Sequence, residues 1–187
     1  MTKTIKVKDI NFLEYMVLDL EELTLYNYYL EYGNLESEDT LEIGFFMDHS
    51  FGFVKDMQYY VSEGLTWDKF FEAVSKITGR DRKELSKESI FKLYKARLYC
   101  IEEIEKINKI EVDNLGHDST IDEEKADISR FNSYGPYIQF DKLSGGDILK
   151  FEDIKKLPYN FCFTKLKLEA DRDNFNFEYA QIIHKKK

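Results

Sequence analysis

The chain has 187 residues, of which 43% are apolar and 16% aromatic, so it can bury a core and is not expected to be disordered throughout. Its 27 basic and 36 acidic residues give a net charge of −9, which argues against general nucleic-acid binding and against an anionic membrane surface. With only 2 Pro and 9 Gly, the composition favours helix.

The N-terminal segment predicts a strand followed by helix. Ile5 and Val7 alternate with lysines, which is typical of a short, half-exposed strand. Asn11 and Glu14 have the spacing of a capping box, so a helix or two short helices should follow and end at Gly33. Because this segment lacks the apolar core of a secretory signal, we predict none.

The region from Leu35 to Gly64 has a weaker pattern. The alternation from Leu41 to Phe45 allows a second short strand. A helix is expected to resume near Val54 and to stop at Gly64.

The clearest helical pattern lies between Thr66 and Glu111. Thr66 is placed as an N-cap, a one-sided row of apolar residues follows, and Gly79 suits a left-handed C-terminal cap. A short helical connector then leads into a long helix from Ser89 to Glu111. The long helix has two apolar stripes, Phe91, Tyr94, Leu98 and Ile101, and Leu93, Cys100, Ile104 and Ile107. So wide an apolar surface predicts contacts on more than one side.

Residues 112–136 are polar and acidic, and they predict a long loop. The four residues 137–140 are a candidate short strand. Gly145 and Gly146 then predict a tight turn, and Asp147 is placed to cap the helix that follows.

Pro158 excludes Leu157 from the helical region, so we predict a helix break at Leu157 and a new helix within a residue or two of Pro158. That helix has two apolar stripes, Phe161, Leu168, Phe175, Tyr179 and Ile182, and Tyr159, Phe163, Leu166, Ala170 and Phe177. One core can cover one stripe of each long helix, so the second stripes should meet each other or a partner. The candidate partner contacts are Phe91, Leu98, Phe161 and Phe175.

No segment carries a complete catalytic or nucleotide-binding motif. The sequence LSGGD at 143–147 is similar to the signature loop of ABC-type ATPases, but no Walker A loop accompanies it, so it is interpreted as a turn and a helix cap. Asp48, His49 and Ser50 are the residue types of a triad, yet adjacent residues cannot point at one another in series. We therefore predict no catalytic residue and no cofactor.

The acidic segment from Asp113 to Glu124 is the candidate metal site. It places His117 and Asp118 among carboxylates that a divalent cation could bind. The spacing differs from that of an EF-hand, and no second His or Cys lies at ligand spacing. We expect a solvated loop without metal; a small enzyme or metal-dependent factor that uses this segment or residues 48–50 is one alternative function.

The remaining features indicate a protein of a reducing compartment. Cys100 and Cys162 lie in apolar helical patterns and predict two buried thiols. No run of about 18 apolar residues predicts a membrane span. The basic run from His184 to Lys187 is interpreted as a solvated tail. We expect a soluble protein made in the cytoplasm, with neither a membrane nor a specific nucleic-acid partner.

Residues 65–107 join a Trp-containing helix ending in Ile-Thr-Gly, an "xxxEL" connector and a long helix. This layout resembles that of small morphogenesis proteins of tailed bacteriophages, including tail-assembly chaperones. The segment KLPYNFCFTKLKLEADRDNFNFEY at 156–179 is similar to proteins of crAss-like phages. The motifs that carry the resemblance are Gly79, Glu84-Leu85 and Pro158-Tyr159, and they assign no catalytic residue.

We expect a mainly α protein, a helical domain with a few short β-strands, forming a single domain over 1–187. Its parts would be a helical core at 54–111, an acidic loop at 112–136 and a C-terminal strand-helix unit at 137–184. The resemblance implies a non-enzymatic structural protein of the virion, near the portal, neck or tail or packaged inside, made in the host cytoplasm. Its partners would be other phage structural proteins, with homo-oligomerisation as a further option. The alternative is a cytoplasmic tail-assembly chaperone absent from the mature virion.

Overall fold

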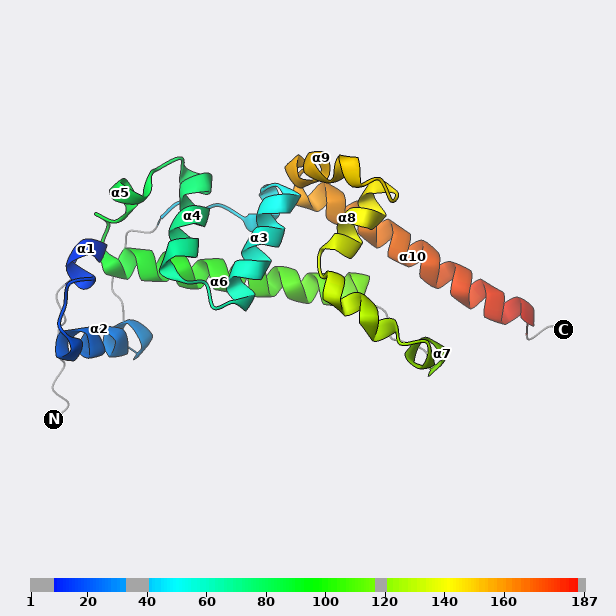
Figure 1. The fold of residues 1–187 in the computed structure, drawn as a ribbon, viewed down its shortest axis with the longest axis horizontal. Coiled ribbons are helices and arrows are strands. Elements are labelled where there is room, and N and C mark those ends of the chain that lie inside the picture. Colours follow the sequence, from blue (N-terminus) through cyan, green and yellow to red (C-terminus); the bar gives the residue numbers. More distant parts are fainter. Residues whose placement is uncertain (1–8, 33–40, 117–120, 185–187) are drawn as a thin grey trace. The chain divides into compact units, whose positions relative to one another are not determined.

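The computed structural model describes residues 9–32, 41–116 and 121–184. These ranges are mainly α-helical (Figure 1), which confirms the expected fold class. Their only β-pairings are two isolated antiparallel bridges, one between Asn11 and Ser89 and one between Ser50 and Pro158.

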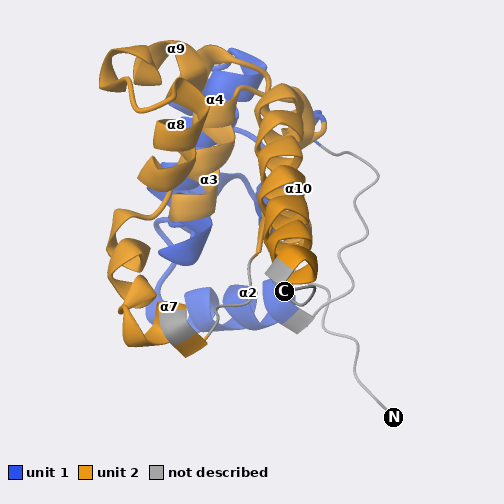
Figure 2. Ribbon diagram, turned by 90° about the vertical axis from the view of Figure 1, so that its right-hand side faces the viewer, with its two compact units in different colours: residues 1–44, 60–103 blue, residues 45–59, 104–187 orange. Residues whose placement is uncertain are grey.

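The chain divides into two compact units (Figure 2). Unit 1 comprises residues 1–44 and 60–103, and unit 2 comprises residues 45–59 and 104–187. Two helices, α3 (Phe51–Ser62) and α6 (Ile90–Leu115), contribute residues to both units. Whether the units fold together as one domain stays a prediction.

Unit 1 is built around short capped helices. Its elements are α1 (Phe12–Tyr15), α2 (Leu20–Tyr32), α4 (Trp67–Thr78), α5 (Arg82–Leu85) and the first part of α6. The capping box predicted at Asn11 and Glu14 is formed, and Asp81 and Glu84 make a second one before α5. These boxes satisfy backbone N–H groups that a four-residue helix cannot satisfy itself.

The core of unit 1 is aromatic. The Phe12 ring lies 4.8 Å from Phe71 and 5.1 Å from Trp67, measured between ring centroids. Thr66 caps α4, and Gly79 ends it with a φ of 69°, both as predicted. Gly64 follows the end of α3 with a φ of 88°, a conformation that glycine adopts without strain.

Unit 2 contains the C-terminal half of the chain. Its elements are 3₁₀-helix η1 (Phe46–Asp48), the first part of α3, the last part of α6, α7 (Ile121–Lys125), η2 (Ile128–Tyr134), α8 (Tyr137–Ser144), η3 (Ile148–Lys150), α9 (Phe151–Lys156) and α10 (Tyr159–His184). Phe51 and Tyr159 are fully buried at its centre. The Phe140 ring packs against Phe51 at 5.2 Å and against Phe151 at 5.7 Å.

Several sequence predictions for the loops and strands are wrong. The segment 112–136 is not one long loop, because α6 continues to Leu115 and both α7 and η2 follow. Residues 137–140 form the start of α8 rather than a strand, and no strand forms at 41–45. A segment of four residues is too short to distinguish a strand from a turn of helix by its periodicity. The strand predicted at Ile5 and Val7, and the helix end at Gly33, lie outside the described residues.

The predicted break before α10 is confirmed. Leu157 is extended, with φ −69° and ψ 150°, and α10 begins at Tyr159. The extended segment is held to the start of α3, since Phe51 N donates to Leu157 O at 2.7 Å and Tyr159 N donates to His49 O at 2.9 Å. Gly145 and Gly146 both have positive φ, and the Asp147 side chain accepts from Leu149 N, as the predicted turn and cap require.

Candidate functional site

The candidate functional site is the outer surface of α10. The inner face of α10 contributes Tyr159, Cys162 and Leu166 to the core of unit 2, and each of these side chains is less than 5% exposed. Beyond Leu166, no residue of α10 described up to Ile183 is buried. The opposite face carries an outer stripe, which we define as Phe161, Leu168, Phe175 and Ile182, with exposed fractions of 68%, 45%, 64% and 53%.

The second half of α10 depends on local interactions. Lys167 pairs with Asp171 at 3.3 Å along the helix, and Lys142 of α8 reaches Asp173 at 3.2 Å. The Phe175 and Tyr179 rings stack at 5.9 Å. Exposed ion pairs of this kind contribute only a few tenths of a kcal/mol each. Because an isolated helix of so few turns is marginal in water, further burial is needed to hold it firmly.

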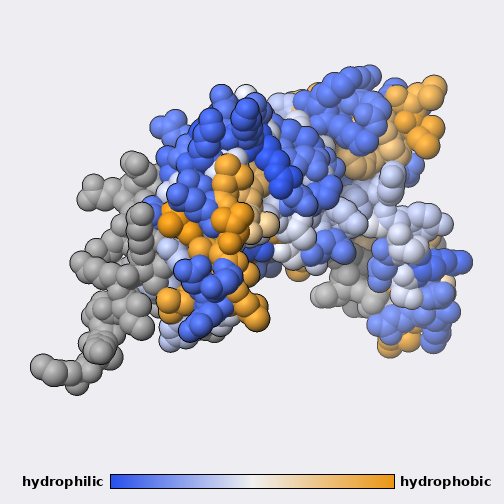
Figure 3. Space-filling model, turned by 60° about the vertical axis from the view of Figure 1, so that its left-hand side comes forward, coloured by the Kyte–Doolittle hydropathy of each residue, from blue (hydrophilic) through white to orange (hydrophobic). Residues whose placement is uncertain are grey.

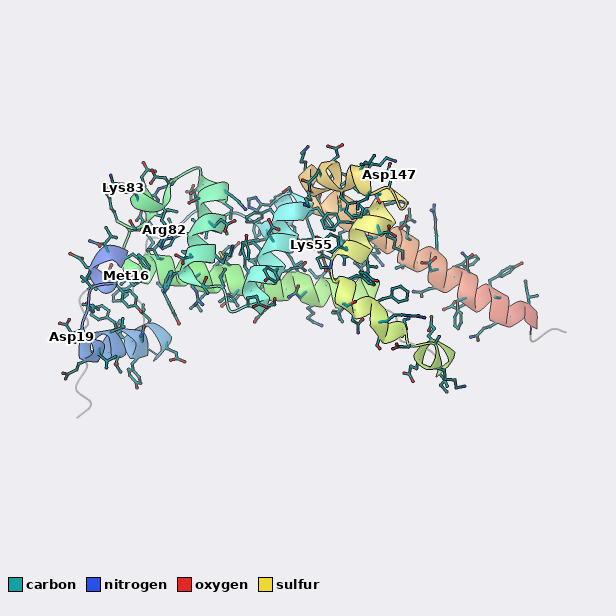
Figure 4. The ribbon with its side chains drawn as sticks, in the orientation of Figure 1. Met16, Asp19, Lys55, Arg82, Lys83 and Asp147 are labelled. Carbon is teal, nitrogen blue, oxygen red and sulfur yellow. The ribbon has the colours of Figure 1, made fainter. Side chains whose placement is uncertain are left out.

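A buried polar cluster fixes the start of α10. Lys55 of α3 donates to both carboxylate oxygens of Glu111, at 2.7 and 2.9 Å, and the Tyr159 hydroxyl donates to Glu111 Oε1 at 2.5 Å. Gln58 Nε2 donates to the other oxygen at 3.2 Å. The side chains of Lys55 and Glu111 are 6% and 13% exposed, and Figure 4 labels Lys55. This cluster ties α3, α6 and α10 together within unit 2.

The protonation states of the cluster follow from burial and pairing. Burial lowers the pKa of Lys55, although the charge of Glu111 opposes this. Burial alone would raise the pKa of Glu111, but the Lys55 charge and the donated hydrogen bonds outweigh it and lower the pKa. Burial and the neighbouring Glu111 charge raise the pKa of Tyr159. The carboxylate accepts hydrogen bonds from Lys55, Gln58 and Tyr159, an arrangement suited to fixing the start of the helix.

The predicted partner contacts differ in burial. Phe91 is buried in unit 1, with its ring 5.5 Å from that of Tyr29, and Leu98 of the same helix is 38% exposed. Phe161 and Phe175 lie on the outer stripe of α10 in unit 2. Phe91 therefore contributes to the core of unit 1, and contact of the other three with a partner stays a prediction.

A second exposed apolar group lies in unit 1 and includes none of the predicted contact residues. Figure 3 shows hydrophobic side chains gathered on the forward face of the molecule, between hydrophilic ones. Met16 and Asp19 mark the connection between α1 and α2 (Figure 4), where Asp19 accepts from Glu22 N at 2.9 Å. The group consists of Leu13, Met16, Val17 and Leu20, which are 54% to 82% exposed. Four apolar residues within eight positions around an Asp cap were the available signal.

The triad residue types serve the local fold. The Ser50 hydroxyl accepts from Phe53 N at 3.3 Å and thereby caps α3. The His49 ring packs against Phe53 at 5.0 Å and against Phe46 at 5.9 Å. These contacts fit the predicted polar turn between aromatic segments.

The structure describes only part of the acidic segment that was considered as a metal site. His117 and Asp118 lie outside the described residues. In the ranges that the structure does describe, no group of three or more His, Cys, Asp or Glu side chains could hold a metal ion. The expected absence of metal at the acidic segment stays a prediction.

The two thiols lie where the sequence placed them. Cys100 and Cys162 are both unpaired and buried, as expected. Burial raises the pKa of the Cys100 thiol to about 12 and also raises the pKa of Cys162. Burial with a raised pKa is typical of structural thiols.

Unit 1 also contains a pocket of about 490 Å³, a size in the range of small-molecule sites. Its lining residues are Leu41, Glu42, Ile43, Gly44, Lys95, Ala96 and Tyr99. The Tyr99 hydroxyl donates to Gly44 O at 3.0 Å, so it holds the 41–44 segment against α6. None of the sequence-predicted site residues lines this pocket.

None of the helices within the described ranges is both long and apolar enough to cross a membrane. Comparison with known proteins gives no relative for this chain, since no family model, curated protein or solved structure matches it.

Proposed function

We propose that this protein acts by assembly rather than by chemistry, as a non-enzymatic structural protein of a tailed bacteriophage particle. The observation that carries the proposal is the outer stripe of α10, which repeats along the helix and remains exposed. The phage setting rests on the resemblance of residues 65–107 and 156–179 to small phage morphogenesis proteins.

The energetics favour a protein partner for the outer stripe. Burying a Phe, Leu or Ile side chain contributes about 1.5–3 kcal/mol, so four of them supply a substantial driving force before the entropic cost of association is subtracted. Exposed apolar surface of this kind, bordered by charged residues, is typical of an interaction site. The net charge of −9 would keep unassembled copies apart in solution.

The partners would be other structural proteins of the particle, and the protein would reside in the virion after synthesis in the host cytoplasm. The exposed group at the α1–α2 connection offers a second contact surface, in unit 1. Two surfaces on different units suit a protein that joins neighbours in an assembly.

The test is mass spectrometry of purified particles made by cells that carry the gene. The proposal predicts that the chain is a constant component of the particles. It also predicts that Phe175→Ser reduces incorporation, because Phe175 is 64% exposed and its loss removes a contact without opening the core.

Leu149→Ser is the matched control, because Leu149 is 87% exposed on η3 and lies outside α10. A chain that is absent from particles yet bound to a tail protein in cell extracts would instead indicate the assembly chaperone. A chain that binds no particle protein at either stage would overturn the assembly proposal.

A further inference from the structure

The outer stripe of α10 repeats with the seven-residue period of a coiled coil. Phe161, Leu168, Phe175 and Ile182 follow one another at intervals of seven residues. A straight α-helix drifts by about 20° per seven residues, so a strict seven-residue repeat is typical of helices that wind around another helix. The stripe spans 21 residue steps, or about 32 Å at 1.5 Å per residue.

The stripe faces away from the body of unit 2. The buried residues Tyr159, Cys162 and Leu166 lie on the opposite side of the helix, since they precede or follow stripe residues by one or two positions. The contacts of unit 2 with α10 therefore leave the stripe open to a second helix along its whole length.

The flanks of the stripe carry opposite charges. One flank consists of the positions three residues after each stripe residue, and it holds Asp171 and Glu178. The other flank consists of the positions four residues after each stripe residue, and it holds Lys165 and Arg172. All four flanking side chains are exposed, and Asp171 and Lys165 already pair along the helix with Lys167 and Glu169.

This charge pattern selects the orientation of a second copy. A two-fold axis along the helices makes a parallel pair, in which the acidic flank of each copy faces the basic flank of the other. A two-fold axis across the helices makes an antiparallel pair, in which acidic flank faces acidic flank and basic faces basic. Like charges brought together across an interface are destabilising, and opposite charges set partner and register.

We propose that the partner of the outer stripe is a second copy of this chain, with the two α10 helices parallel and in register. Each stripe residue then packs against its own counterpart, and Asp171 of each copy faces Arg172 of the other. This inference rests on the proposed assembly role and gives that role a defined first contact. Because the stripe supplies one apolar residue per seven, where a full coiled coil has two, the dimer should be reversible.

Sedimentation equilibrium of the purified full chain measures the pairing directly. We expect a concentration-dependent dimer, and Phe175→Ser should raise its dissociation constant at least about tenfold, which corresponds to the loss of about 1.4 kcal/mol of contact. Leu149→Ser should leave the constant unchanged. Circular dichroism of each variant checks that the fold is retained, as expected for substitutions at exposed positions.

A charge exchange tests the orientation. Arg172→Asp should weaken the dimer, because it places an acid opposite Asp171 of the other copy, and the double variant Asp171→Arg with Arg172→Asp should restore it. A spin label on Gln181→Cys gives the geometry. A parallel pair keeps the two labels within about 20 Å, whereas an antiparallel pair centred on the stripe separates them along the axis by about 28 Å at 1.5 Å per residue.

A chain that stays monomeric at all concentrations would overturn the inference while leaving the proposed function in place, since the particle experiment tests that function separately. A dissociation constant that Phe175→Ser leaves unchanged would overturn the inference as well. So would spin labels at the distance expected for an antiparallel pair. If the chain dimerises and its variants behave as expected, but the chain is absent from purified particles, the pairing is upheld and the proposed role in the phage particle is overturned.

Discussion

The two long helices, α6 and α10, have the same length of 26 residues but differ in how they are packed. In α6, buried residues recur from Ile90 to Ile107, over most of its length. In α10, they stop at Leu166, within the first third of the helix. Both sequences are rich in apolar residues at helical spacing, so composition alone does not separate them.

The difference shows that apolar residues at helical spacing can serve two purposes. Most helical stability in proteins comes from tertiary packing, and α6 receives it from the rest of the chain. The outer stripe of α10 receives little, since its residues remain 45% to 68% exposed. Under our proposal, a second chain supplies it.

The largest expected effect comes from breaking the buried polar cluster around Glu111, which connects α6 to the start of α10. Glu111→Ala leaves Lys55 buried without its partner, and removal of one member of a buried pair costs about 3–5 kcal/mol of unfolding free energy. Urea denaturation measures the loss. Glu105→Ala, at an exposed position of the same helix, is the control and should change stability by less than about 0.5 kcal/mol. Equal losses in both variants would contradict an anchoring role for the cluster.

The next effect contrasts the packing of the two helices. Leu93→Ala on α6 empties a fully buried site and should cost about 2–5 kcal/mol. Phe175→Ala on α10 should change the unfolding free energy of the monomer by no more than about 0.5 kcal/mol. Denaturation at concentrations below the dissociation constant of the dimer makes the comparison. A large loss for Phe175→Ala would mean that the chain itself covers the outer stripe.

These expectations show how far the sequence alone could lead. The caps at Asn11, Thr66 and Asp147 and the break at Leu157 were predicted, because each is a local signal within a few residues. The helix at 137–144 was missed, because its eight residues are too few to reveal a clear period.

The buried polar cluster and the burial pattern of α10 depend on the tertiary fold. Lys55 and Glu111 are 56 positions apart, so no local pattern could pair them. The two stripes of α10 were visible in the sequence, but not that burial would be limited to Tyr159, Cys162 and Leu166, where unit 2 packs.

The smallest effect concerns pH. The pKa of Glu111 in the folded chain lies below its ordinary value of 4.5, so the stabilisation from its ionised form is fully present above about pH 4.5. It is lost as pH falls through the lowered value. Glu111→Gln should therefore be less stable than the wild type at neutral pH, and the gap should narrow with acid. Denaturation curves at several pH values measure it; a gap that widens with acid would have the wrong sign.

Under our proposal, association stabilises the second half of α10, whereas α6 is stabilised by its own chain. Amide hydrogen exchange of residues 90–107 and 171–183 measures this, first in dilute monomer and then at a concentration where the dimer predominates. We predict slow exchange in 90–107 under both conditions, and exchange in 171–183 that is fast in the monomer and slowed in the dimer. Exchange in 171–183 that is as slow as in 90–107 in the dilute monomer would contradict the claim.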